Sequence, residues 1–171
     1  NMPAVALRGL TILPGMIAHF DISRERSLRA VEEAMEQDQK IYLVTQRNVD
    51  SEDPTQEDLY QMGIVADIKQ VVRLQNDVVR ILVDGISRAA LLGFTGNEKY
   101  LEAEICYCDS NADSLPEDLR EAMLLGVREA FHRYAAVVGK ISKELIRQID
   151  QYEDLEKLID YVTNNLPVSY E

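Results

Sequence analysis

The 171-residue sequence is poor in the features that disulfide bonding, nucleic-acid binding and membrane insertion require. It has two cysteines, Cys106 and Cys108, and a disulfide between such close neighbours would be strained, so free thiols in a reducing cytoplasm are expected. The net charge of −12 would repel phosphate backbones and anionic lipid. No apolar run reaches the roughly 18 residues of a membrane span, and no secretory pattern follows the amino end. The sequence predicts a cytoplasmic protein with no nucleic-acid or membrane partner.

Signatures of catalysis and metal binding are also missing. The P-loop pattern G-x-x-x-x-G-K-[ST] is approached only by Gly139-Lys140, and neither G-x-S-x-G nor H-E-x-x-H occurs. The spacing of Cys106 and Cys108 differs from that of zinc-binding pairs, so both are expected to be small core residues of a strand. His132 is expected to be a partly exposed surface histidine. We therefore predict no catalytic residue, no metal site and no cofactor in this sequence.

The residues that are present change in pattern near residue 110. Before it, apolar residues alternate or form short blocks, which is typical of strands. The turn at residues 75–77 suits a tight hairpin because asparagine and aspartate tolerate positive φ, and Asp84-Gly85 is expected to turn the chain again. Closely spaced hairpins favour a small twisted barrel, because closure hides the strand edges. Seven strands are predicted, at residues 4–7, 16–20, 41–46, 64–72, 78–84, 87–94 and 101–108.

Helical patterns interrupt this region and replace it after residue 110. Residues 27–38 predict one amphipathic helix capped by Ser23 or Ser27, and residues 53–60 predict a capped single turn. Three further helices are predicted: one capped by Ser114 with Glu117 and ending at Gly139, one beginning at Ser142, and one from about residue 153 to 165. The predicted fold is α+β, with a β-rich domain at residues 1–110 and a helical domain at residues 111–171 that forms the first part of a longer, truncated bundle.

Residues 7–16, LRGLTILPGM, form an apolar stretch that glycine and proline interrupt. These breaks keep the stretch out of regular strand pairing, so Leu10, Ile12 and Leu13 are not expected to point inward together. An exposed apolar surface would serve to bind other chains. The alternative is that these side chains fill the end of the barrel. The candidate binding residues are Leu10, Ile12, Leu13, Pro14 and Met16.

Residues 24–26 are candidates for subunit assembly. Arg24 and Arg26 lie at a predicted helix start, where positive charge opposes the helix dipole, so they require carboxylate partners. These partners would belong to another subunit, with Glu25 taking part, or to the same domain. The second alternative is a local ion pair worth under about 1 kcal/mol.

Several of these segments resemble the N-terminal domain of the Lon family of ATP-dependent bacterial serine proteases. Leu7-Arg8 with Pro14-x-Met16 fits the family's opening L-R…P-x-M, and residues 23–27, SRERS, fit G-R-E-K-S with serine in place of glycine. The resemblance also covers IYLVTQ, DPTQEDLYQMGIVADI with its G-x-x-A-x-I, VRILVDGISRA with its V-E-G-x-x-R-A, and NLPVS at residues 165–169.

The resemblance implies a PUA-like pseudo-barrel followed by a helical bundle. It also implies a noncatalytic domain that recognises unfolded or tagged protein substrates and supports assembly of a homo-oligomer, a hexamer in the full-length family. The ATPase module, with its ATP and Mg²⁺, and the Ser-Lys protease module would lie outside this chain. Alternatives are a stand-alone or adaptor Lon-type domain that reads a peptide or small-molecule ligand, RNA binding through the barrel, which the negative charge disfavours, and a self-contained hydrolase, which the missing motifs disfavour.

Overall fold

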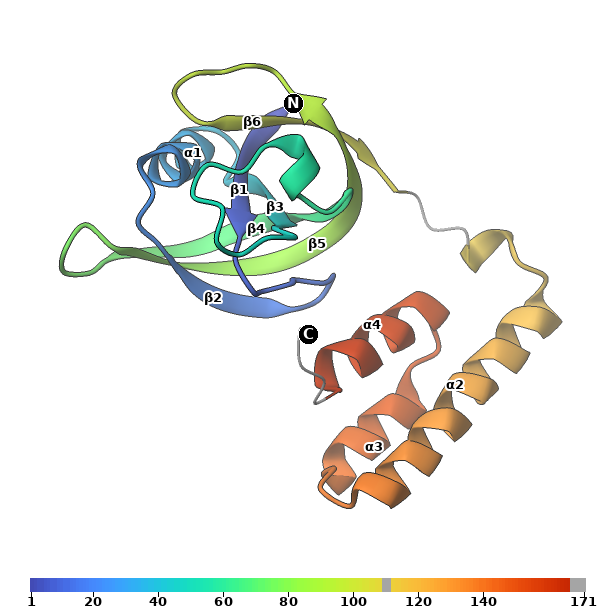
Figure 1. Cartoon of the computed structure of the whole chain (residues 1–171). Helices are drawn as coiled ribbons and strands as arrows, with labels where there is room; N and C mark the ends of the chain where they lie inside the picture. The colour runs from blue at the N-terminus through green and yellow to red at the C-terminus, as the bar shows by residue number, and fades with distance from the viewer. Residues whose placement is uncertain (109–111, 167–171) are drawn as a thin grey trace. The chain divides into compact units, whose positions relative to one another are not determined.

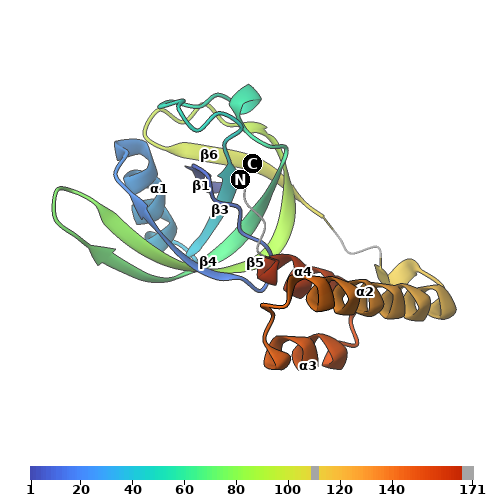
Figure 2. The same cartoon turned by 60° about the horizontal axis from the view of Figure 1, so that its bottom comes forward.

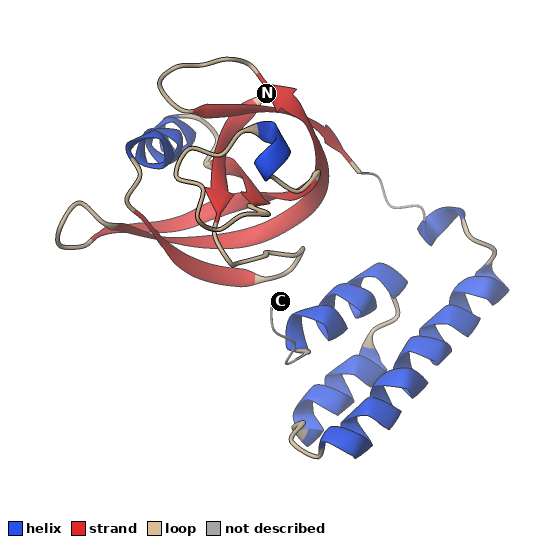
Figure 3. Cartoon of the chain, in the orientation of Figure 1, coloured by secondary structure: helices blue, strands red, loops and turns tan. Residues whose placement is uncertain are grey.

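The computed structural model describes residues 1–108 and 112–166, which form two compact units that separate after Cys108 (Figure 1). Figure 3 shows that the sheet lies in the first unit and that the second is helical. The α+β class predicted from the sequence is confirmed.

The elements of the first unit are β1 (Met2–Leu7), β2 (Ile17–Ile22), α1 (Glu25–Glu36), β3 (Lys40–Thr45), the 3-10 turn η1 (Gln56–Asp58), β4 (Met62–Arg73), β5 (Val79–Phe94) and β6 (Leu101–Tyr107). Those of the second are the 3-10 turn η2 (Ala112–Ser114), α2 (Glu117–Val138), α3 (Lys143–Gln151) and α4 (Leu155–Asn165).

The six strands are ordered β2-β5-β4-β3-β1-β6, and a further pairing of β5 with β6 closes five of them into a ring (Figure 2). Strand β5 makes this closure possible because it is 16 residues long. Its residues 79–84 pair with β2, residues 79–90 pair with β4, and residues 89–94 pair with β6. Strands β1 and β3 are parallel, and the other pairs are antiparallel. Closure leaves few unpaired strand edges, as the sequence pattern predicted.

Both faces of the central strands β1 and β3 are buried. Side chains alternate between the faces of a strand, and here Val5 and Leu43 enter one apolar cluster while Ala4 and Tyr42 enter another. The first cluster includes the apolar face of α1, with Ala30, Val31 and Ala34. Complete burial of an aliphatic side chain contributes about 1.5–3 kcal/mol, which explains why β1 and β3 are nearly continuous apolar runs rather than alternating ones.

Two of the predicted helix starts are wrong. Helix α1 begins after Arg24, which makes no side-chain cap, and Ser27 is buried within the helix. Helix α2 begins after Pro116, and Ser114 belongs to η2 instead of a capping box. In both places a nearby serine matched the capping pattern, but the helix begins after a residue that makes no side-chain cap.

The predicted end of α2 and the predicted starts of α3 and α4 hold, whereas α1 ends at Glu36, two residues before its predicted end. Helix α2 ends at Gly139, whose φ of +66° is left-handed. Ser142 accepts a hydrogen bond from the Leu145 amide at 3.1 Å, and Asp154 accepts one from the Lys157 amide at 2.9 Å. Helices α2, α3 and α4 share a small core; the longer bundle that was expected is not in this chain. The buried residues of that core are Leu124, Phe131, Ala135, Ile149, Leu155 and Leu158.

The hairpin that joins β4 and β5 was predicted correctly, but the next turn was not. Asn76 and Asp77 have φ of +60° and +58°, as a tight hairpin requires. Asp84-Gly85 is not a turn, because β5 continues through it, so two predicted strands are one. Gly85 instead allows the backbone of residues 13–16 to lie close to β5. Its carbonyl accepts from the Gly15 amide at 2.8 Å, and its amide donates to the Met16 carbonyl at 2.9 Å. A Cβ atom at Gly85 would lie 2.3 Å from the Leu13 carbonyl oxygen.

Gly85→Ala should destabilise the first unit, because the Leu13 backbone would have to move to avoid the new methyl group. Overpacking of this kind costs about 1–3 kcal/mol. The matched control is Gly126→Ala in the exposed interior of α2, where a Cβ atom meets nothing within 4 Å and the change should stabilise by about 0.5–1 kcal/mol. Urea unfolding of both variants measures the two changes. Equal stability of Gly85→Ala and the parent would contradict the close approach.

The stability of the protein should fall at alkaline pH through Tyr42. This residue is fully buried and its hydroxyl donates to the Ala89 carbonyl at 3.0 Å. Burial, together with the nearby Cys108 charge, raises the pKa of Tyr42 to about 12, whereas the unfolded chain titrates near its ordinary pKa of about 10. The contribution of Tyr42 is therefore complete below pH about 10 and is lost as the pH rises towards the folded pKa, by up to about 1.4 kcal/mol per pH unit. Urea unfolding at several pH values should show a shallower decline for Tyr42→Phe, and parallel curves would contradict the assignment.

Candidate functional site

The loop of residues 7–16 lies between two hollows of the first unit. Leu10 lines one of them, and Ile12 and Leu13 line the other. The loop is attached at both ends: the Thr45 hydroxyl donates to the Leu10 carbonyl at 2.8 Å, and the backbone bonds to Gly85 hold its later residues. The loop that the sequence singled out therefore separates two concave surfaces.

The structure divides the five apolar candidates of this loop. Ile12 is 5% exposed and belongs to the main core cluster, so its prediction as a surface residue is wrong. The reason is that the loop lies against Gly85 of β5, so the Ile12 side chain packs on the sheet. The other four candidates are half-buried: Leu10, Leu13, Pro14 and Met16. Leu10 and Met16 pack against the core cluster, so only part of each side chain is accessible.

Exposed apolar residues lie beyond the loop, where sequence patterns alone did not single them out. Tyr60, Met62 and Leu92 are 41%, 48% and 61% exposed. A hollow of about 570 Å³ is lined by Leu13, Tyr60 and Met62 among others, and a neighbouring hollow of about 860 Å³ is lined by Tyr60 and Leu92. We call the area formed by Leu13, Arg47, Tyr60, Met62 and Leu92 the Tyr60 surface. Of these five residues, the sequence analysis proposed only Leu13 as a binding residue.

Arg47 fixes the centre of the Tyr60 surface. Its guanidinium carbon lies 4.6 Å from the centroid of the Tyr60 ring, and its Nε donates to the Leu59 carbonyl at 2.9 Å. A guanidinium over an aromatic ring is an attractive pair. The ring of Tyr60 is therefore held in place between the two hollows that it lines.

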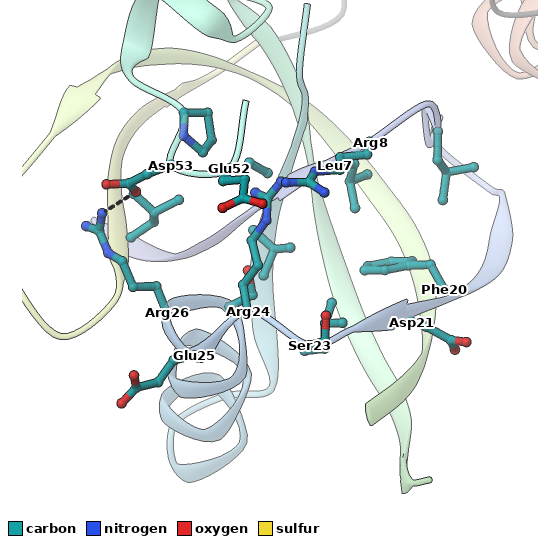
Figure 4. Close-up of a pocket in the computed structure, with 17 residues that line it drawn as sticks. Leu7, Arg8, Phe20, Asp21, Ser23, Arg24, Glu25, Arg26, Glu52 and Asp53 are labelled. Atoms are coloured by element: carbon teal, nitrogen blue, oxygen red, sulfur yellow. Dashed lines mark hydrogen bonds and ion pairs between the residues drawn. The ribbon is translucent and has the colours of Figure 1, made fainter. Parts of the chain in front are cut away.

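The second part of the site is a hollow of about 650 Å³ at the start of α1, which we call the arginine hollow (Figure 4). Arg24 donates from Nη2 to Gln46 Oε1 at 2.9 Å and to the Ser51 carbonyl at 3.1 Å. Arg8 Nη2 donates to the same carbonyl at 3.1 Å. Burial and the neighbouring Arg8 charge lower the pKa of Arg24, although an arginine remains protonated. The apolar lining consists of Val5, Ala6, Leu7, Leu10, Phe20, Ile22, Pro54 and Leu101.

The assembly candidates all have partners within their own chain. Arg26 Nη1 lies 3.0 Å from Asp53 Oδ1, which Figure 4 marks with a dashed line, and Glu25 pairs with Arg29 one helical turn away. Arg24 bonds to an amide and a carbonyl. These contacts favour the local ion pair that we considered as the alternative, and a role in assembly stays a prediction.

The cysteines and histidines do not form a metal centre among the residues that the structure describes. Cys106 and Cys108 are free, as expected, but both are exposed, so their prediction as core residues is wrong. Cys108 Sγ lies 3.6 Å from Met62 Sδ, beside the Tyr60 surface. His132 is exposed and lies 2.8 Å from Asp150, in agreement with the prediction. Within residues 1–108 and 112–166, no helix has the length and apolar content needed to cross a membrane.

The whole chain, residues 1–171, matches the family described as the ATP-dependent protease La (LON) substrate-binding domain. The chain belongs to this family. It is 36% identical over its full length to the Lon protease of Lachnoclostridium phytofermentans and 35% identical over 169 residues, 97% of the chain, to that of Clostridioides difficile. It covers 21% and 22% of these proteins, about a fifth of their length.

Solved structures of the family share the fold. The N-terminal domain of the Mycobacterium avium complex Lon protease has a TM-score of 0.59 at 17% identity, with 96% of this chain and 99% of that one covered. A Lon N-terminal domain protein from Xanthomonas campestris has a TM-score of 0.54 at 14% identity, with 97% and 98% covered. The resemblance drawn from the sequence is thereby confirmed. Of the segment NLPVS at residues 165–169, the last three residues lie outside the described part of the chain.

The pair of Arg26 and Asp53 should contribute little to stability. Their side chains are 40% and 79% exposed, and exposed ion pairs are worth about 0–1 kcal/mol. Asp53→Asn should therefore lower the free energy of unfolding by less than about 1 kcal/mol. Urea unfolding should show a comparable or larger loss for Asp58→Asn, which removes the carboxylate that caps η1 through the Thr55 amide at 2.9 Å. A much larger loss for Asp53→Asn would show that the ion pair is not a marginal surface contact.

Proposed function

We propose that the first unit of this chain captures unfolded or tagged polypeptides on the Tyr60 surface, as the substrate-binding part of an ATP-dependent serine protease. The observation that carries the proposal is the group of exposed apolar side chains around two adjoining hollows, Tyr60, Met62 and Leu92. Family membership supports a role in substrate binding. The identity of the surface rests on the geometry.

The physical basis is the difference in exposed apolar area between unfolded and folded chains. An unfolded polypeptide presents apolar side chains that a folded one buries, and transfer of these groups from water into an apolar hollow is favourable. The Tyr60 ring lines both hollows. Neighbouring side chains of one extended client would therefore enter the two hollows on either side of the Tyr60 ring. Such a surface binds any polypeptide with exposed apolar side chains and requires no defined sequence.

Assembly would strengthen this binding. The relatives extend about five times as far as the chain, and we propose that the rest of such a protein supplies an ATPase module with ATP and Mg²⁺, a Ser-Lys protease module, and assembly into a cytoplasmic homo-oligomer. Several weak sites on one ring bind a long client together, and tethering of this kind raises the overall affinity by roughly 10² to 10⁴. No single hollow needs to bind tightly.

Substitution of Met62 and Leu92 by glutamine should weaken client binding. Both side chains are about half exposed, so the double change removes apolar contact area with little loss of core packing. The chain has no tryptophan, so the fluorescence of a permanently unfolded, tryptophan-containing polypeptide reports binding without background. The dissociation constant should rise at least about tenfold, equivalent to about 1.4 kcal/mol.

The matched control is the double variant Leu125→Gln and Val137→Gln. These residues of α2 are 56% and 87% exposed, so the control removes two exposed apolar side chains from the other unit. Its client affinity should match that of the parent. Equal weakening by both double variants would reject the Tyr60 surface and indicate nonspecific apolar binding.

A further inference from the structure

We propose that the arginine hollow binds a carboxylate that lies beside an apolar side chain, the chemistry found at the carboxyl end of a polypeptide with an apolar last residue. The proposal rests on the proposed function in one respect, namely that the ligands are polypeptides. It adds a second subsite with a different chemistry, on the other side of the loop of residues 7–16.

The charge in the hollow is the first reason. Arg8 and Arg24 both donate to the Ser51 carbonyl at 3.1 Å, so two positive groups converge on one neutral acceptor. The ion pairs found among the described residues include neither arginine. Burial and the neighbouring Arg8 charge lower the pKa of Arg24, and the Glu52 and Asp53 charges offset this only in part. A carboxylate ligand would relieve this repulsion.

The carboxylates that line the hollow are mostly committed elsewhere. Asp53 pairs with Arg26, Glu25 with Arg29, and Asp21 with Arg80 at 2.7 Å. Figure 4 shows Glu25 and Asp21 pointing away from the two arginines.

Glu52 and Asp53 are the two carboxylates whose charges act on Arg24, and each raises its pKa. Of these two, Asp53 is already shared with Arg26, at 3.0 Å, which leaves the charges of Arg8 and Arg24 only partly compensated.

The hydrogen-bond donors are positioned in advance. Gln46 is fully buried and accepts from Arg24 Nη2 at 2.9 Å, so the guanidinium is attached to a rigid part of the fold. A guanidinium carries five N–H donors, and Nη2 is the only nitrogen of Arg8 or Arg24 with a protein acceptor among the described residues. Donors thus remain for a bidentate bond to a carboxylate, the strongest form of this pair.

The walls of the hollow supply the second half of the recognition. Leu7, Leu10, Phe20 and Leu101 belong to its lining, and Figure 4 shows the Phe20 ring across the hollow from Arg24. Its volume of about 650 Å³ lies within the range of roughly 300–1,000 Å³ that is typical of small-ligand sites. One terminal residue, with its side chain against Phe20 and its carboxylate on the arginines, would fit this arrangement.

The test measures the fluorescence anisotropy of a labelled pentapeptide that ends in Leu-Phe with a free carboxylate. The 171-residue chain should bind this peptide at least tenfold more tightly than its carboxyl-amide form. A third peptide, amidated and ending in Leu-Phe-Asp, places the carboxylate on a side chain. Weak binding of this peptide identifies the main-chain terminus as the source, and equal binding identifies any carboxylate next to an apolar residue. Equal affinity for the free-acid and amide forms of the first peptide would overturn the proposal.

Variants assign the binding to the hollow. Arg24→Gln and, separately, Arg8→Gln should each weaken the free-acid peptide at least tenfold. Arg8 is exposed and makes one bond to the protein, so its variant tests the site even where Arg24→Gln disturbs the fold. The matched control is Arg73→Gln, which removes the same charge from an arginine that is 84% exposed and outside the hollow, and it should leave the affinity unchanged. Equal weakening by all three would overturn the proposal in favour of general electrostatics.

The outcome is separable from that of the proposed function. The variant Met62→Gln with Leu92→Gln should retain full binding of the free-acid peptide, because neither residue lines the arginine hollow. Loss of peptide binding in this double variant would indicate that the peptide binds at the Tyr60 surface, and it would overturn the proposal. If the same double variant bound the unfolded polypeptide as tightly as the parent does, the proposed function would be rejected. The peptide result would still stand.

Discussion

The pairing of β5 with three other strands is the constraint on which the first unit depends. One strand of 16 residues pairs with β2 at its start, with β4 along most of its length and with β6 at its end, so the sheet closes into a ring. Closure requires β5 to continue through Gly85 and allows the loop of residues 7–16 to approach it. The same strand carries Leu92 to the Tyr60 surface. The architecture and the placement of the surface therefore share one cause.

The loop of residues 7–16 is best described as a boundary between two concave surfaces. Ile12 anchors it in the core, Leu13 lines an apolar hollow, and Leu10 lines a hollow with two arginines at its edge. The two hollows differ in chemistry because different elements complete them. Residues 60–64 and the end of β3 complete the first, and the start of α1 with residues 52–54 completes the second. A polypeptide that lies across the loop would meet both.

Local patterns predicted the elements well where local physics decides them. Apolar blocks located the strands, Asn76 and Asp77 marked a hairpin, and Ser142 marked a helix start. They misled where a distant contact decides. Gly85 resembled a turn residue, but its missing side chain makes room for the Leu13 backbone. Cys106 had the spacing of a core residue, yet it lies on an exposed part of β6.

The sequence by itself determined the class of fold, the family and the candidate loop, because composition, periodicity and motif spacing are properties of neighbouring residues. Only the tertiary structure decided which side chains reach the surface. It buried Ile12, exposed Leu92, and brought Arg8 within reach of the carbonyl that Arg24 also contacts. Ile12 and Leu92 are 80 residues apart in the sequence, and Arg8 and Arg24 are 16 residues apart. Their exposure and proximity depend on how the closed sheet brings distant segments together, which no local pattern encodes.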